Sequence, residues 1–125
     1  MFIIEDTTIN ITRGNNAVIG VTADAHDDTP YIFQNGDIIR FAIYEKGNYN
    51  NLKREKLVTV NEETEEVKIE LTKDDTKIDD IINKPVNYWY EIELIKGETV
   101  QTILGHDENG AKIFRLYPEG VEEEW

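Results

Sequence analysis

A run of alternating aromatic, branched and charged side chains from Tyr88 to Ile95 constrains the fold of this chain more than any other feature. After Lys96-Gly97-Glu98 the alternation resumes, from Thr99 to Gly105. Successive side chains of a β-strand point to opposite faces, so a period of two predicts strands with one buried face. A glycine between two such runs predicts a hairpin. The segment therefore indicates an antiparallel β-sheet.

The pairing within this hairpin follows from its polar residues. A two-residue loop at Lys96-Gly97 would place Gln101 opposite Ile92, with a polar side chain on the buried face. A three-residue loop, 96–98, avoids this, and we expect it although such loops usually carry glycine third. The pairs it predicts are Leu94 with Val100, Ile92 with Thr102 and Tyr90 with Leu104.

The same register predicts which side chains form the core. Tyr90 and Ile92 are expected to lie inside, together with Phe41 and Ile43 of an earlier strand. The side chains between them, Glu91 and Glu93, are then expected to face solvent.

Alternation recurs along the chain and predicts the remaining elements. We expect strands over residues 8–12, 17–23, 38–44, 57–60, 67–71 and 112–117, with 45–56 as a loop and 107–110 as a second hairpin turn. Residues 72–87 break the rhythm and predict one short helical turn, capped by Thr72 and ended by Pro85. These elements predict an all-β fold. An immunoglobulin-like antiparallel β-sandwich is the leading architecture, and a small open barrel is the alternative.

Length and composition limit the chemistry that the chain can perform. Its 125 residues fit one domain, placed at residues 1–118 and followed by an acidic C-terminal tail at 119–125. It contains neither cysteine nor serine, which removes disulfides, thiolate metal sites and two common nucleophiles. We expect no enzymatic activity and no cofactor.

The charge of the chain limits its partners. There are 26 acidic and 13 basic residues, a formal net charge of −13. A surface this acidic repels phosphate backbones and anionic lipids, so we expect neither nucleic acid nor membrane as a partner. No segment is long and apolar enough to span a membrane. The start of the chain, Met1 to Asp6, lacks the basic and apolar regions of a signal peptide.

Two polar clusters are candidates for chemistry. Asp24, His26, Asp27 and Asp28 offer metal ligands, but the glycine and closing glutamate positions of a calcium loop hold other residues. His106 with Asp107 offers an acid–base pair, but Asn109-Gly110 beside it is typical of a turn. A solvated loop is the better interpretation of both clusters, and no metal ligand or catalytic residue is predicted.

Trp89 lies on the face of its strand opposite to Tyr88 and Tyr90. Large aromatic side chains in strands are usually core residues, so the favoured interpretation is that Trp89 packs under a loop such as 72–85. If that face is exposed instead, Trp89 marks a contact surface, with Tyr44 and Tyr49 as its companions.

Four segments, followed by Thr102-Ile103-Leu104-Gly105, occur in an order that resembles a known family. The segments are Ile11-Thr12-Arg13-Gly14, Asn35-Gly36-Asp37-Ile38-Ile39-Arg40-Phe41, Leu71-Thr72-Lys73-Asp74-Asp75-Thr76 and Tyr88-Trp89-Tyr90-Glu91-Ile92-Glu93-Leu94. The pattern is similar to the small β-sandwich proteins of phages and prophages of Gram-positive bacteria, in particular the N-terminal module of phage baseplate upper proteins. Two positions depart from it: Asn15-Asn16 replaces Asp-Thr, and 83–87 lacks the usual glycine.

This resemblance implies a structural protein of a phage tail or baseplate. Its partners would be other tail or baseplate proteins, with a homo-oligomer as a further option, and its location the virion or the bacterial cytoplasm before assembly. Two alternatives from other classes are a carbohydrate-binding module and a small carboxylate-dependent hydrolase. Exposure of Trp89 in a groove beside Tyr44 or Tyr49 would favour the first of these, and two carboxylates facing each other in a pocket the second.

Overall fold

The computed structural model describes residues 1–25, 29–80 and 82–119 of the chain. In this part of the chain the secondary structure consists of strands, and no helix is present that could cross a membrane. The all-β prediction is therefore confirmed. The strands are β1 (Phe2–Glu5), β2 (Thr8–Thr12), β3 (Ala17–Val21), β4 (Ile38–Glu45), β5 (Asn48–Thr59), β6 (Val67–Leu71), β7 (Val86–Lys96), β8 (Thr99–Leu104) and β9 (Lys112–Tyr117).

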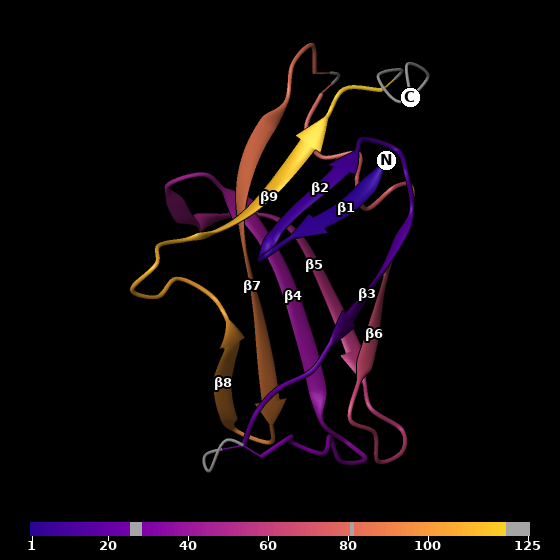
Figure 1. Cartoon of the computed structure of the whole chain (residues 1–125), viewed down its shortest axis with the longest axis vertical. Coiled ribbons are helices and arrows are strands. Elements are labelled where there is room, and N and C mark those ends of the chain that lie inside the picture. The colour runs from indigo at the N-terminus through magenta and orange to yellow at the C-terminus, as the bar shows by residue number, and fades with distance from the viewer. Residues whose placement is uncertain (26–28, 81, 120–125) are drawn as a thin grey trace.

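The strands form one large and one small sheet (Figure 1). The large sheet has the order β1-β2-β9-β7-β4-β5, and β8 adds to β7. Its pairs are antiparallel except for β2 with β9, which run parallel. The small sheet consists of β3 and β6, paired antiparallel. It lies across one face of the large sheet, so the large sheet has one covered and one open face (Figure 1).

The core fills the space between the two sheets. Ile19 and Ile69 of the small sheet join the same buried cluster as Phe41, Tyr90 and Phe114 of the large sheet. The ring of Phe41 stacks on that of Tyr90 at 5.5 Å between centroids and meets Phe114 edge-on at 6.4 Å. Burial of one such side chain stabilises the fold by roughly 1.5–3 kcal/mol.

The predicted core of the hairpin strand is confirmed. Tyr90, Ile92, Phe41 and Ile43 are each at most 4% exposed. Glu93, like Glu91, lies on the opposite face, as expected from the alternation, but is only partly exposed. The reason is a set of ion pairs on that face, described below.

The predicted register of the β7–β8 hairpin is wrong. Lys96 pairs with Thr99 and Leu94 with Gln101, so the loop is the two residues Gly97-Glu98. Gly97 has a φ of +62°, which suits the first position of a II′ turn. The polar Gln101 is tolerated on this face because it lines a solvent-accessible hollow, together with Leu94, beyond the end of the small sheet.

The expected second hairpin at 107–110 is a turn without a hairpin. Asp107 and Gly110 form an isolated bridge, but β8 and β9 do not pair with each other. Both instead pair with β7, β8 along its C-terminal half and β9 along its N-terminal half. They follow one another along the same edge of β7, and residues 105–111 loop out between them (Figure 1).

Most of the segment 45–56, predicted as a loop, belongs to the long strand β5. A turn at Gly47, with a φ of +81°, folds β5 back onto β4. The asparagines and charged residues in β5 hide its strand character in the sequence. They are tolerated because β5 is an edge strand, where charged side chains are usual.

The helical turn expected after Thr72 is not confirmed. Thr72 and Asp75 do exchange the hydrogen bonds of a capping pair, but bends and turns follow instead of a helix. Ion pairs tie this segment to β5: Lys56 Nζ lies 2.9 Å from Asp75 Oδ2, and Lys53 Nζ lies 2.9 Å from Asp79 Oδ1. The segment buries Ile78 completely and covers one end of the core.

The predicted acidic tail begins at Glu119, whose carboxylate pairs with Arg13 at 2.9 Å. The rest of the tail, 120–125, lies outside the described residues.

Candidate functional site

The open face of the large sheet points away from the small sheet and carries the predicted contact residues. Cross-strand pairs identify its side chains, because directly paired residues project from the same face. Arg40 pairs with Leu57 and Glu93, and Tyr44 pairs with Leu52 and Trp89. Further members of this face include Ile38, Ala42, Glu55, Glu91, Ile95 and Val100, and also Thr59, Thr102, Ile113, Asn87 and Arg115.

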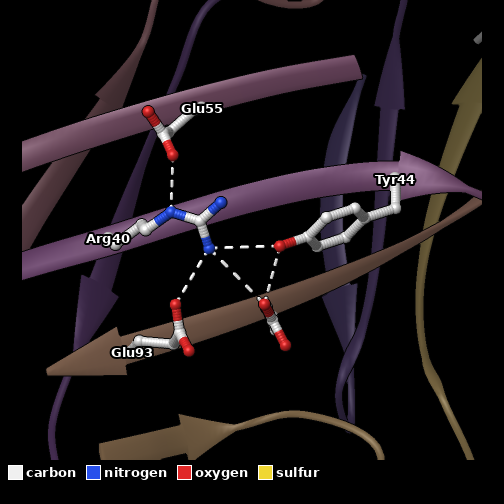
Figure 2. Close-up of polar contacts among 5 residues, drawn as sticks. Arg40, Tyr44, Glu55 and Glu93 are labelled. Carbon is white, nitrogen blue, oxygen red and sulfur yellow. Dashed lines mark hydrogen bonds and ion pairs between the residues drawn. The ribbon is translucent and has the colours of Figure 1, made fainter. Parts of the chain in front are cut away.

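A charged network occupies the middle of the open face (Figure 2). Arg40 donates through Nε to Glu55, at 2.5 Å, and through Nη1 to Glu93, at 2.9 Å. The same Nη1 lies 3.1 Å from Tyr44 Oη and 3.5 Å from Glu91 Oε1. The Tyr44 hydroxyl in turn donates a hydrogen bond to Glu91 Oε1, with 2.7 Å between the two oxygens. The network thus joins three adjacent strands, β5, β4 and β7.

Burial and hydrogen bonding fix the charges in this network. Burial by itself would lower the pKa of Arg40, but the hydrogen bonds with Tyr44, Glu55 and Glu93 outweigh it and raise that pKa. Burial, and then the hydrogen bond to Glu91, raise the pKa of Tyr44. Arg40 therefore stays cationic and Tyr44 neutral around pH 7. With three carboxylates around one guanidinium, the network carries an excess of negative charge.

An aromatic cluster lies beside the network. The ring of Tyr49 contacts Tyr44 at 5.2 Å and Trp89 at 5.1 Å between centroids, and His106 contacts Trp89 edge-on at 5.7 Å. Tyr49 Oη also lies 3.4 Å from His106 Nδ1. Burial, followed by the charge of Glu91, raises the pKa of Tyr49. The loop 105–111 thus places a histidine on a surface that strands otherwise build.

The structure brings together all three residues that the sequence singled out. Tyr44 is buried, Trp89 is half-buried and Tyr49 is 36% exposed. The expectation that Trp89 packs under the segment 72–85 is wrong. That segment lies on the covered face, where Asp79 accepts a hydrogen bond from Tyr88, whereas Trp89 packs against Tyr49 and His106.

Sequence reasoning missed the charged network and the apolar side chains that flank it. The exposed fractions are 58% for Leu57, 55% for Val100 and 45% for Leu52. Alternation along β7 did place Glu91 and Glu93 outward. The signal for the rest was hidden because 45–56 was predicted as a loop. Leu52 was therefore assigned to no sheet face, and the predicted strand 57–60 was too short to show which strand Leu57 lies beside.

The other candidates gain no support as sites. Of the proposed metal loop, Asp24 forms a bridge with Pro30, and 26–28 lie outside the described residues. No group of three potential ligands is placed to hold a metal ion in the described ranges. Asp107 binds Lys112 at 3.0 Å, while His106 contacts Trp89 in the aromatic cluster, so each side chain is engaged with a different partner.

The described residues of the open face do not show the geometry that would favour either alternative. The carboxylates of Glu91 and Glu93 face Arg40 on an open surface, not each other in a pocket. Four surface hollows among the described residues are lined by other side chains, and Trp89, Tyr44 and Tyr49 border none of these four.

Comparison with known proteins gives no further identification: no family model, curated protein or solved structure matches the chain.

Proposed function

We propose that this chain is a structural or assembly protein of a phage or prophage tail or baseplate, and that it acts through protein–protein contacts made by the open face. The observation that carries the contact role is the exposure of Leu57, Val100 and Leu52 on one sheet face, which no second layer covers in the described part of the chain. Apolar side chains gathered on one exposed face are typical of an interaction surface. The phage context rests on the sequence resemblance described above.

We further infer that the architecture is an immunoglobulin-like sandwich of the variable type. The order β9-β7-β4-β5 corresponds to strands G-F-C-C′ of that fold, and β3-β6 corresponds to B-E. In this interpretation β8 and β9 are two halves of one G strand, interrupted by the loop 105–111. A sandwich of this kind agrees with the fold that the resemblance implies.

Co-purification with the products of the genes that flank its coding sequence tests the proposed function. We expect at least one tail or baseplate protein to bind the purified chain reproducibly. Leu57→Glu should abolish this binding, because it places a charge in the apolar part of the contact. Val18→Glu is the matched control, since Val18 is 52% exposed on the small sheet.

Binding of the same proteins to a glycan array distinguishes the proposed function from the carbohydrate-binding alternative. Saturable glycan binding that Tyr49→Ala abolishes, without capture of any tail protein, would replace the proposed function. We favour protein contact because Tyr44 is buried and the rings of Tyr44 and Tyr49 meet at 74°, so the cluster does not present a flat stacking platform.

A further inference from the structure

We propose that the open face binds a basic partner surface, in which lysine or arginine side chains alternate with apolar ones, and that it does not bind a second copy of this chain. The inference rests on the proposed contact role of this face and specifies the chemistry of the partner. It follows from how charge and apolar surface are distributed over four strands.

Exposed apolar side chains flank an acidic band on the open face. Leu57 lies on β5 directly beside Arg40, Val100 lies on the opposite edge strand β8, and Leu52 and Tyr49 lie toward the other end of β5. The acidic band is the network around Arg40, in which the side chains of Glu91 and Glu93 remain 22% and 18% exposed. Leu52 and Leu57 are roughly 15 Å apart along β5 at the usual strand rise.

Arg40 does not neutralise the acidic band. Three carboxylates, those of Glu55, Glu91 and Glu93, surround this one guanidinium. Carboxylates have lone pairs beyond those that a single guanidinium uses, so oxygen acceptors remain for an incoming cation. Glu55, with a side chain 38% exposed, is the most accessible of the three.

Charge argues against a second copy as the occupant. A symmetric contact places the same patch on both sides, so acidic bands would face each other. Like charges juxtaposed in an interface are unfavourable by several kcal/mol. The net charge of −13 adds a long-range repulsion between copies. A basic partner is attracted by the same field.

The size of the patch predicts a weak contact. Four adjacent strands give the patch a width of roughly 14 Å, and its length along β5 is the roughly 15 Å given above. The area of such a patch is well below the ~800 Å² that each partner commonly buries in a stable complex. A single contact should therefore dissociate readily, as expected for a unit that is held by several contacts in an assembly.

A fluorescence titration with defined peptides tests the proposal. The probe is a blocked seven-residue peptide of alternating leucine and lysine, and its control replaces lysine with glutamate. Trp125→Phe leaves Trp89, which lies in the open face, as the single tryptophan. We expect saturable quenching by the leucine–lysine peptide, none by the leucine–glutamate peptide, and weaker binding as NaCl rises.

Matched variants separate local from global effects. Glu91→Gln with Glu93→Gln should weaken peptide binding at least about fivefold, because the peptide's lysines lose their acceptors. Glu62→Gln with Glu63→Gln changes the net charge equally at exposed residues of another turn and should change binding less than about twofold. Leu57→Asn should weaken binding and Val18→Asn should not.

Three results would overturn the proposal: equal weakening by both glutamine pairs, equal effects of Leu57→Asn and Val18→Asn, or a dimer of the free chain that Leu57→Asn dissociates. The test is independent of the phage context. If tail proteins bind the open face but the peptide does not, the partner chemistry is wrong and the proposed function stands. If the peptide binds and no flanking product does, the proposed function fails.

Discussion

At the scale of single residues, side chains on the covered and open faces of β7 stabilise the fold in different ways. On the covered face the side chain of Ile92 is 4% exposed in the core. On the open face the carboxylate of Glu91 accepts a hydrogen bond from the Tyr44 hydroxyl and lies near Arg40. Neighbouring positions of one strand therefore stabilise the fold by different means, packing in one case and charged hydrogen bonds in the other.

Ile92→Ala should lower the free energy of unfolding by roughly 2–5 kcal/mol, through lost burial and a cavity. Val100→Ala should change it by less than about half a kcal/mol because Val100 is 55% exposed. Urea unfolding followed by circular dichroism measures both. A larger effect at Val100 would mean that the open face is covered in solution.

Asp37 is the clearest source of acid sensitivity. It is 3% exposed and accepts hydrogen bonds from Tyr31 Oη at 2.8 Å, Gln34 N at 2.9 Å and Lys96 Nζ at 3.1 Å. Burial alone would raise the pKa of Asp37, but these bonds outweigh it and lower that pKa. A lowered pKa contributes stability above about pH 4, the value for an unfolded chain, and this contribution is lost as pH falls further.

Asp37→Asn should therefore destabilise the protein at pH 7 by about 1–3 kcal/mol, because the carboxylate partners are left poorly paired. It should also flatten the loss of stability as pH falls below about 4. Urea unfolding of both proteins at a series of pH values checks this. Parallel pH profiles for the two proteins would contradict the role given to Asp37.

At the scale of elements, the turns decide the register. The predicted hairpin register differs from the observed one by one residue, because the observed loop is Gly97-Glu98 and neither Lys96-Gly97 nor 96–98. Glycine as the first loop residue of a II′ turn was the signal in the sequence that points to the observed pairing. The first part of β5, before the predicted strand 57–60, was missed for another reason: its composition is that of a loop, and its pairing with β4 depends on the tertiary structure.

Gly97→Ala should lower the free energy of unfolding by about 1–2 kcal/mol, since residues with a Cβ disfavour the observed φ of +62°. No atom of another residue lies within 4 Å of the added Cβ, so the cost arises from the backbone alone. Gly97→Asn should cost less, because asparagine adopts positive φ more readily. Thermal unfolding of the two variants measures the difference, and equal costs would contradict a conformational origin.

At the scale of the whole molecule, the net charge of −13 opposes compaction. Salt screens this repulsion, with a Debye length that falls from roughly 30 Å at 0.01 M to 10 Å at 0.1 M. Raising NaCl over this range should increase the melting temperature by a few degrees, as followed by circular dichroism. A fall would show that the local ion pairs, such as those of Arg40, outweigh the overall repulsion.

The sequence alone determined the fold class and much of the core. Alternation along 88–95 and 38–44 assigned Tyr90, Ile92, Phe41 and Ile43 to one face, because a strand's period of two is a local property. It also singled out Trp89 as a large side chain on the wrong face for the core.

The tertiary structure decided which residues of other strands share the open face with Trp89. Only the pairing of β5 with β4 brings Tyr49, Leu52 and Leu57 onto the face of Tyr44 and Trp89. Only the order of the sheet places three carboxylates around Arg40. These contacts join positions up to 53 residues apart, and the local periodicity of a strand carries no information on which other strand lies beside it.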